Sequence, residues 1–319
     1  MNAAGRLTAY GAGLAVAFTG AFAVAGAVVP DDAADQTAQA RQEVEGERMD
    51  DHAAAGQEHP GQAPAVEDVR GLAIAQDGFL LTPVRSPGAV GEAGDLSFQV
   101  QDAAGEPVVD YRTAHDKDLH LIVVRADGSG YRHVHPRLDP STGTWSIPWR
   151  WAEAGTYRVF VDFVPATGDD EKNVTLSRTV QVAGDVAPTT PEPTATDEVD
   201  GFTVDVSGEL TAGSTSELTV SVRRDGEPVT TLEPYLGAFG HLVALREGDL
   251  AYLHVHAAGD EPAEGDTAGP EIGFAATAPT PGRYLLYLDF QVDGKVRTAE
   301  LVLDAGAAHG TPDTSDHGH

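Results

Sequence analysis

The chain has 319 residues, with 50 acidic against 20 basic side chains and a formal net charge of −30. A field this negative repels phosphate, which excludes nucleic acid and anionic lipid headgroups as partners. The sequence has no cysteine, so disulfides, iron–sulfur clusters, thiol catalysis and blue-copper sites are excluded as well. The hydrophobic share of 41% suffices for packed cores, and the length indicates about two domains.

Residues 1–30 are predicted to be a signal peptide or a membrane anchor. Arg6 is the only charged side chain before the apolar run 7–29, which we expect to form a leader helix rich in Ala, Gly and Val. The tripeptide at 23–25, Ala-Val-Ala, matches the small-x-small pattern of a cleavage site. A run of this length also suffices to cross a bilayer uncleaved. We therefore expect an extracytoplasmic protein, either secreted or anchored to the cell membrane by residues 7–29.

Three further segments are predicted to lack a core. Residues 31–65 are small, polar and acidic, residues 185–196 are rich in Pro and Thr, and residues 306–319 are small and polar with several histidines. None of them carries enough apolar surface to offset the entropy lost on ordering the chain. We expect a disordered acidic spacer, an extended linker and a disordered tail. The folded domains are then residues 66–184 and 197–305.

The two predicted domains are copies of one another. Gly-Glu-Pro-Val occurs at 105–108 and again at 226–229, an offset of 121 residues. After an insertion of six residues in the second copy, the Asp-Phe pair at 162–163 recurs at 289–290, an offset of 127 residues. An offset that stays constant across dissimilar intervening residues indicates internal duplication.

Each copy is predicted to be an antiparallel β-sandwich of the Ig-like or cupredoxin-like type. Runs such as 96–100 and 218–222 alternate between polar and apolar residues and are rich in β-branched side chains. Turn residues interrupt the chain every eight to twelve positions, and helical periodicity is absent outside the leader. About seven short strands in roughly 110 residues are typical of such a sandwich.

A predicted hairpin in the first copy carries His120, His133 and His135 around a turn at 127–130. If His133 lies opposite Val124, all three imidazoles lie on one face of the hairpin, because side chains alternate along each strand. Three neutral imidazoles suit Cu(II), Zn(II) or Ni(II), and the Irving–Williams order favours copper. The sequence therefore predicts a copper or zinc site.

The second copy repeats this pattern with His241, His254 and His256, so a second three-histidine site is predicted. An alternative remains open, because the face that carries the histidines of the first copy also carries Ile122 and Tyr131. On that interpretation the histidines are hydrogen-bonded packing residues.

Three further residues are candidates for supporting roles at the metal sites. His115 precedes the hairpin in the first copy only, as a fourth ligand or as a residue of a surface loop. Asp162 and Asp289 each lie within an otherwise apolar strand and therefore need a polar partner. Such a carboxylate either orients a ligating imidazole or binds a nearby turn or arginine.

The motifs LHLIVV at 119–124, YRHVHP at 131–136 and GTYRVFVDF at 155–163 resemble extracytoplasmic bacterial Ig-like domains of the YtkA-like type. More distantly they resemble copper-resistance C-type sandwiches. The resemblance implies an Ig-type fold and a role in heavy-metal handling. The chain departs from the copper-resistance C pattern, which has a histidine at the mature N-terminus, because cleavage after Ala25 would leave Gly26 there. Only the histidines already named carry over, as candidate ligands.

These patterns predict an exported or membrane-anchored copper- or zinc-binding protein of the buffering or chaperone type. Its expected partners are metal ions and a membrane metal transporter or surface protein, and it contacts the membrane only through its N-terminal segment. The alternative is a tandem Ig-like scaffold or interaction module without metal. No enzyme is predicted, because the sequence has neither a helical metalloprotease motif nor a serine-centred nucleophile elbow.

Overall fold

The computed structural model describes residues 69–166, 172–253, 255–263 and 265–307. All regular elements in these ranges are strands, so the predicted all-β class is confirmed. The predicted leader, the whole of the predicted spacer and nearly all of the predicted tail lie outside the described residues. Among the described residues, no helix is long and apolar enough to cross a membrane.

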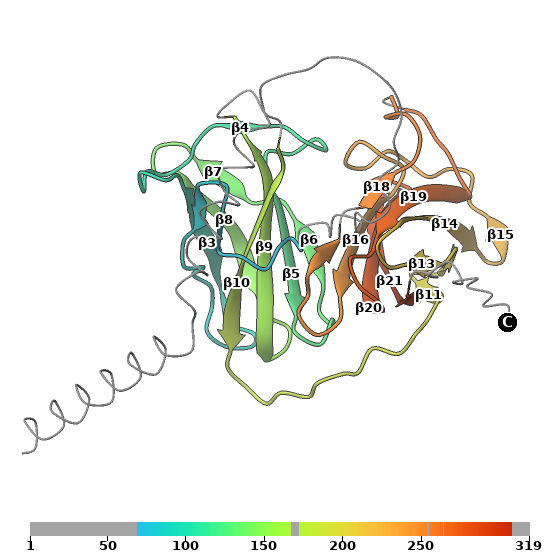
Figure 1. Cartoon of the computed structure of the whole chain (residues 1–319), viewed down its shortest axis with the longest axis horizontal. Coiled ribbons are helices and arrows are strands. Elements are labelled where there is room, and N and C mark those ends of the chain that lie inside the picture. The colour runs from blue at the N-terminus through green and yellow to red at the C-terminus, as the bar shows by residue number, and fades with distance from the viewer. Residues whose placement is uncertain (1–68, 167–171, 254, 264, 308–319) are drawn as a thin grey trace, which may run out of the picture. The chain divides into compact units, whose positions relative to one another are not determined.

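The first repeat is a sandwich of two sheets (Figure 1). Its strands are β1 (Ala75–Gln76), β2 (Phe79–Leu81), β3 (Ala93–Gln101), β4 (Tyr111–Arg112), β5 (His120–Arg125), β6 (Arg132–Val134), β7 (Arg137–Asp139), β8 (Thr144–Arg150), β9 (Gly155–Pro165) and β10 (Val174–Val182). One sheet has the order β1-β2-β3-β8-β7, and the other has the order β10-β9-β5-β6 with β4 paired to β9.

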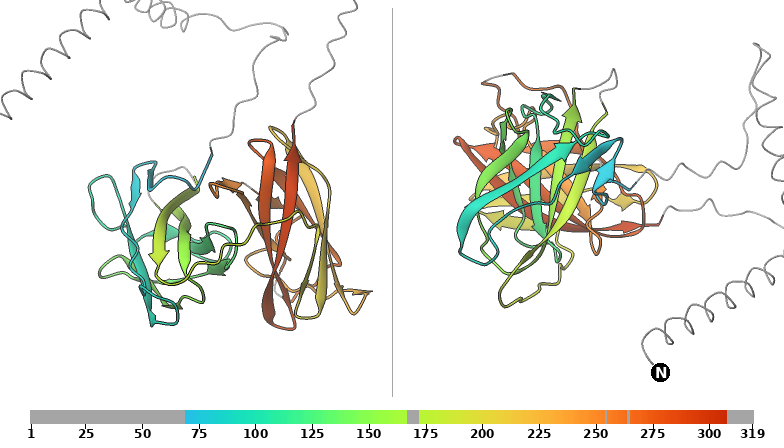
Figure 2. Two further views of the ribbon diagram at one scale, coloured as in Figure 1. Left: turned by 90° about the horizontal axis from the view of Figure 1, so that it is seen from below. Right: turned by 90° about the vertical axis from the view of Figure 1, so that its left-hand side faces the viewer.

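The second repeat is also a sandwich of two sheets, and Figure 2 shows each repeat as its own pair of sheets. Its strands are β11 (Thr196–Val199), β12 (Phe202–Ser207), β13 (Leu210–Thr211), β14 (Thr215–Arg224), β15 (Glu227–Pro228), β16 (His241–Arg246), β17 (Tyr252–Leu253), β18 (Val255–Ala257), β19 (Glu271–Thr277), β20 (Gly282–Val292) and β21 (Lys295–Gly306). The sheet orders are β11-β12-β14-β19-β18, with β15 paired to β14, and β13-β21-β20-β16-β17.

Strand β5 is buried along its whole length because it packs on both of its faces. Leu121 and Val123 point into the core of their own sandwich. Ile122 and Val124 point the other way and pack against the second repeat. Since side chains alternate along a strand, His120 lies on the same outward face as Ile122. The histidine face of the hairpin is therefore the surface between the repeats, and not the core of the first sandwich.

The contact between the repeats, here called the inter-repeat cluster, is formed by the outward faces of equivalent strands. Its buried members are Ile122, Val124, Tyr131, Phe160, Val243, Leu245, Leu250, Leu285 and Tyr287. The rings of Tyr131 and Tyr287 stack with centroids 3.9 Å apart. The equivalent residues in the duplicated sequence, Tyr252 and Phe160, also meet, at 5.9 Å. The two repeats thus use the same surface, in the manner of an internal dimer.

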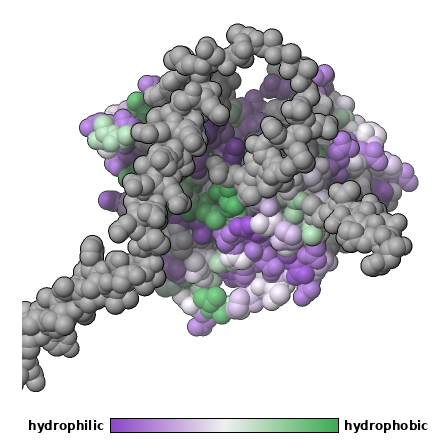
Figure 3. Space-filling view, in the orientation of Figure 1, coloured by the Kyte–Doolittle hydropathy of each residue, from purple (hydrophilic) through white to green (hydrophobic). Residues whose placement is uncertain are grey.

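The face of the molecule shown in Figure 3 is mostly hydrophilic over the described residues, with apolar residues in small separate patches. The exposed large apolar side chains among the described residues are few, and Ile74 and Val186 are examples. The two sheets that carry the histidine strands bury their outer apolar faces against each other, which leaves the surface polar.

The predicted register of the first hairpin was wrong by two residues. His133 pairs with Ile122, and not with Val124. The turn closes earlier than predicted, because Arg125 accepts a hydrogen bond from Gly128 N–H and donates its own N–H to Ser129 O. A shift of two residues keeps every side chain on its predicted face, whereas a shift of one would reverse it. The three histidines consequently still share one face.

Candidate metal centre

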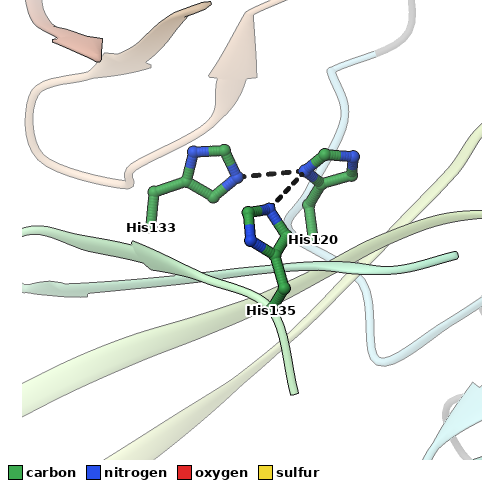
Figure 4. Close-up of side chains that lie close together, drawn as sticks. All are labelled: His120, His133 and His135. Carbon is green, nitrogen blue, oxygen red and sulfur yellow. Dashed lines mark hydrogen bonds between the residues drawn. The ribbon is translucent and has the colours of Figure 1, made fainter. Parts of the chain in front are cut away.

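Three imidazoles of the first repeat converge beside the inter-repeat cluster (Figure 4). His120 is the first residue of β5, His133 lies on β6, and His135 directly follows that strand. His120 Nδ1 is 3.1 Å from His133 Nε2 and 3.2 Å from His135 Nε2. One nitrogen from each ring lies within 4.8 Å of the other two. The arrangement gathers three potential ligand atoms around one point.

Two of the rings are held from behind by oxygen acceptors. His120 Nε2 is 3.1 Å from Ala114 O, and because a carbonyl oxygen can only accept, this nitrogen carries the proton. His133 Nδ1 is 2.8 Å from Asp289 Oδ2 in the second repeat. Ligating histidines commonly donate their second ring nitrogen to a carbonyl or a carboxylate in this way. When Asp289 is ionised both outer nitrogens donate, and the inner nitrogens of His120 and His133 then present lone pairs to each other.

The second repeat supplies a fourth imidazole and the carboxylate. His241 and Asp289 pair across β16 and β20. The His241 ring is 4.9 Å from that of His133 and stacks nearly parallel to that of His120 at 5.8 Å. His241 is two residues from Val243 on its strand, and Asp289 is two residues from Tyr287. Side chains at this spacing lie on the same face, so both residues lie on the inter-repeat face. The centre is therefore built from both repeats.

Burial keeps the imidazoles of the centre neutral. Desolvation, and then the neighbouring imidazoles, lower the pKa of His133 and of His135 to about 3. The same causes hold the pKa of His241 well below its usual range, and desolvation also lowers the pKa of His120. Burial raises the pKa of Asp289 to about 7, opposed by a hydrogen bond from the Thr298 hydroxyl. Neutral imidazoles are the form that binds a metal ion.

We expect the metal-free protein to lose stability as the pH falls below about 6.5. Imidazoles whose pKa is lowered on folding bind protons more readily in the unfolded chain, so acid favours unfolding. Asp289 acts in the opposite sense, because its folded pKa is raised, but it is one group against four. Thermal unfolding in the presence of a chelator between pH 7.5 and 5 measures the fall in midpoint. His241→Leu should make the fall shallower, and parallel curves for the two proteins would contradict the assignment.

Sequence comparison identifies both repeats with one family. Residues 75–184 and 197–307 each match the model of a domain of unknown function, DUF8832. The chain belongs to the DUF8832 family. The expected tandem copy is confirmed by the two DUF8832 matches, and the comparisons show neither a YtkA-like nor a copper-resistance C-type family. No curated protein matches the sequence.

Solved structures similar to the DUF8832 pair include Salmonella alpha-2-macroglobulin reacted with methylamine, at 17% identity and a TM-score of 0.25 over 75% of this chain and 15% of that one. The D0-D1 domain of intimin matches at 12% identity and a TM-score of 0.19, over 68% of this chain and 92% of that one. A marsupial T cell receptor matches at 11% identity and a TM-score of 0.23, over 70% and 62%. The chain spans only a small part of the macroglobulin.

The second DUF8832 repeat does not place its histidines as the first does. His254 lies outside the described residues. His256 is exposed on β18, which pairs with β19 in the other sheet. The chain leaves the β16 sheet directly after Leu253, whereas in the first repeat the change of sheet comes after Val134. The two repeats therefore differ in where the strands change sheet. His241 and His256 line one cavity, and the predicted second group of three stays a prediction because it includes His254; among the described residues, the three-histidine group found is that of the first repeat.

The two predicted carboxylates have different partners. Asp162 accepts hydrogen bonds from Asn173 Nδ2 at 2.8 Å and from Thr175 Oγ1 at 2.5 Å. One predicted role of Asp289 was to orient an imidazole, and the structure shows that contact. The imidazole, however, is that of His133 in the other repeat. Sequence reasoning missed this contact and the approach of His241. The apolar run inside β5 was the signal for a contact with the other repeat, because a strand whose residues do not alternate between polar and apolar is buried on both faces.

His115 lies in a tight turn between Ala114 and Lys117, which exchange two backbone hydrogen bonds. His115 and Asp116 have left-handed backbones, with φ of 49° and 62°, as a type I′ turn requires. The turn brings the His115 ring to 5.7 Å from that of His241 and to 6.1 Å from that of His120. The same turn supplies the Ala114 carbonyl that accepts from His120.

Proposed function

We propose that this DUF8832 protein binds one copper or zinc ion at His120, His133 and His135, as an extracytoplasmic metal buffer or chaperone. The observation that carries the proposal is the pair of inner nitrogens on His120 and His133. These nitrogens lie 3.1 Å apart, and both outer nitrogens lie against oxygens; in the tautomer in which the outer nitrogens carry the protons, the inner lone pairs face each other. Two facing lone pairs repel, and a cation placed between the nitrogens removes the repulsion.

The spacing of the nitrogens fits an ion of this class. Bonds of about 2.0 Å arranged tetrahedrally separate the ligand nitrogens by roughly 3.3 Å, and a right-angled arrangement separates them by roughly 2.8 Å. The two separations from His120 Nδ1, 3.1 and 3.2 Å, lie between these values. Imidazole ligands suit Cu(II) and Zn(II), whereas Mg²⁺ and Ca²⁺ require oxygen ligands. The ligand set therefore favours copper or zinc.

The extracytoplasmic location rests on sequence alone. The apolar run 7–29 precedes an acidic segment, which is the order expected of a leader followed by exported chain. Sequencing the N-terminus of the protein isolated from its host, with membrane and soluble fractions kept apart, tests the location. A chain that begins near residue 26 would indicate secretion, and an intact N-terminus in the membrane fraction would indicate an anchor. An intact N-terminus in the cytosol would refute the proposed location.

We expect Zn(II) or Cu(II) to raise the thermal midpoint of the full chain. A ligand that binds only the native state at one hundred times its Kd adds about 2.7 kcal/mol, which corresponds to roughly 5–10 °C for repeats of this size. Calorimetric titration should give one ion at the cluster, and His133→Ala should remove that ion and the shift in midpoint. Binding that survives in His133→Ala belongs to other histidines. No shift in the wild-type protein would instead support a scaffold without metal.

A further inference from the structure

A cavity of about 420 Å³ adjoins the three-histidine cluster on the side of the second repeat. It is lined by His115, His241 and His256, and also by Asp260 and Glu261. Resting on the proposed function, we infer that a bound copper or zinc ion enters and leaves the cluster through this cavity, with His241 and His115 as transient ligands. The protein would then hand its ion to an acceptor at the cavity, which is the action of a chaperone and not of a store.

The imidazoles form a continuous series from the cluster to the cavity. The His133 and His241 ring centroids are 4.9 Å apart, and those of His241 and His115 are 5.7 Å apart. Rings at these separations let an ion exchange one imidazole for the next as it moves along the series. Direct approach to His133 from solvent is closed, because its side chain is only 1% exposed and that of Asp289 only 3%, whereas the half-buried His135 offers a second approach to the cluster.

The turn that carries His115 is built at a cost in backbone energy. A left-handed conformation is unfavourable by about 1–2 kcal/mol for a residue other than glycine, and Asn or Gly is usual in such a turn. The second repeat has the same turn with Leu236 and Gly237, whose φ values are 57° and 75°. Leu236 stands at the position equivalent to His115, so the turn itself does not require an imidazole. The imidazole at this position is present in the first repeat, where His120, His133 and His135 meet.

The charge at the cavity suits a cation. Asp260 and Glu261 line it, and Glu261 lies over the backbone of Gly237, where an added Cβ would come within 3.3 Å of Glu261 Oε1. Carboxylates at the mouth of a cavity raise the local concentration of cations and accelerate their association. The same carboxylates are not needed to hold an ion at the cluster, since none of its three ligands is an acid.

The test measures rates and affinity separately on the full chain. Zinc-loaded protein is mixed in a stopped-flow instrument with a chromophoric chelator, and association is measured with free Zn(II). We expect His115→Leu, which installs the residue of the second repeat, to slow both association and release about tenfold while Kd is unchanged. Asp116→Asn, in the same turn, is the matched control and should leave both rates unchanged. Asp260→Asn combined with Glu261→Gln should slow association and weaken its dependence on ionic strength.

Other results of these measurements would contradict either the route or the proposed function. Unchanged rates in His115→Leu would overturn the proposed route. A tenfold loss of zinc affinity in this variant would show that His115 is a ligand of the bound ion at equilibrium, and this result would also overturn the route. Failure of the wild-type protein to bind zinc would refute the proposed function itself. A folded wild-type protein that binds zinc normally but shows no effect of the cavity variants would refute only the route.

Discussion

Replacing Tyr287 by alanine should lower the free energy of unfolding by about 3–5 kcal/mol, the range measured for large buried aromatic side chains. The Tyr287 side chain is 2% exposed, stacks on Tyr131 at 3.9 Å and donates a hydrogen bond to Gly128 O at 2.5 Å. All of these contacts are made with the other repeat. We therefore expect the substitution to separate the unfolding of the two repeats as well as to weaken the protein.

The three tryptophans allow this separation to be measured. Trp145, Trp149 and Trp151 all lie in the first repeat, so their fluorescence reports on that repeat alone, while far-ultraviolet circular dichroism reports on both. In the wild-type protein the two signals should change together. In Tyr287→Ala they should change at different denaturant concentrations, which is a standard test for loss of two-state behaviour.

Tyr284→Ala is the matched control for this experiment. Tyr284 is also fully buried on β20, but it points into the core of the second repeat. Its loss should destabilise the protein to a similar extent and leave the two signals coincident. Coincident signals in Tyr287→Ala would show that the inter-repeat cluster does not couple the repeats.

Asp289→Asn should weaken binding of Zn(II) or Cu(II) by about 10–100-fold, the range typical of residues that hold a ligating histidine. An asparagine amide can donate to His133 Nδ1, which would move the imidazole proton to Nε2, where it blocks the ligand position. The effect on folding should be smaller, because the amide has nearly the same shape as the carboxylate. Competition titration against a chelator of known affinity measures the change.

Asp162→Asn provides the control, because Asp162 occupies the equivalent position in the duplicated sequence and its carboxylate is bound by Asn173 and Thr175. We expect its metal affinity to remain within about twofold of the wild-type value. Equal losses in the two variants would show that the charge near the histidines matters, and not the orientation of His133.

The local patterns in the sequence were sufficient for the fold and for the faces of the strands. Alternation along 96–100 and 218–222 predicted strands that the structure contains, and the common face of His120, His133 and His135 survived a register error because the error was an even number of residues. The register itself depended on hydrogen bonds around Asp127 and Ser129, which local composition does not determine.

The composition of the centre could not be predicted from one repeat at a time. His241 was assigned to its own hairpin because the duplication suggested two equal sites, whereas packing of the repeats brings it to the first. Whether His256 joins it depends on where the chain changes sheet, after Leu253 in one repeat and after Val134 in the other. Such a difference arises from packing between sheets. The sequence does not reveal it, because the two repeats keep the same offset of 121 residues before and after the point where the chain changes sheet.

The near-parallel stacking of His120 on His241 has a consequence for how such a protein arises. These residues are equivalent in the two copies, so they meet at the axis that relates one repeat to the other. A repeat on its own would expose the apolar face that carries Ile122, Val124 and Phe160, and a second copy could cover it only with an identical set of side chains. Because the two repeats here differ in sequence, the first carries the three-histidine group while the second supplies the carboxylate of Asp289.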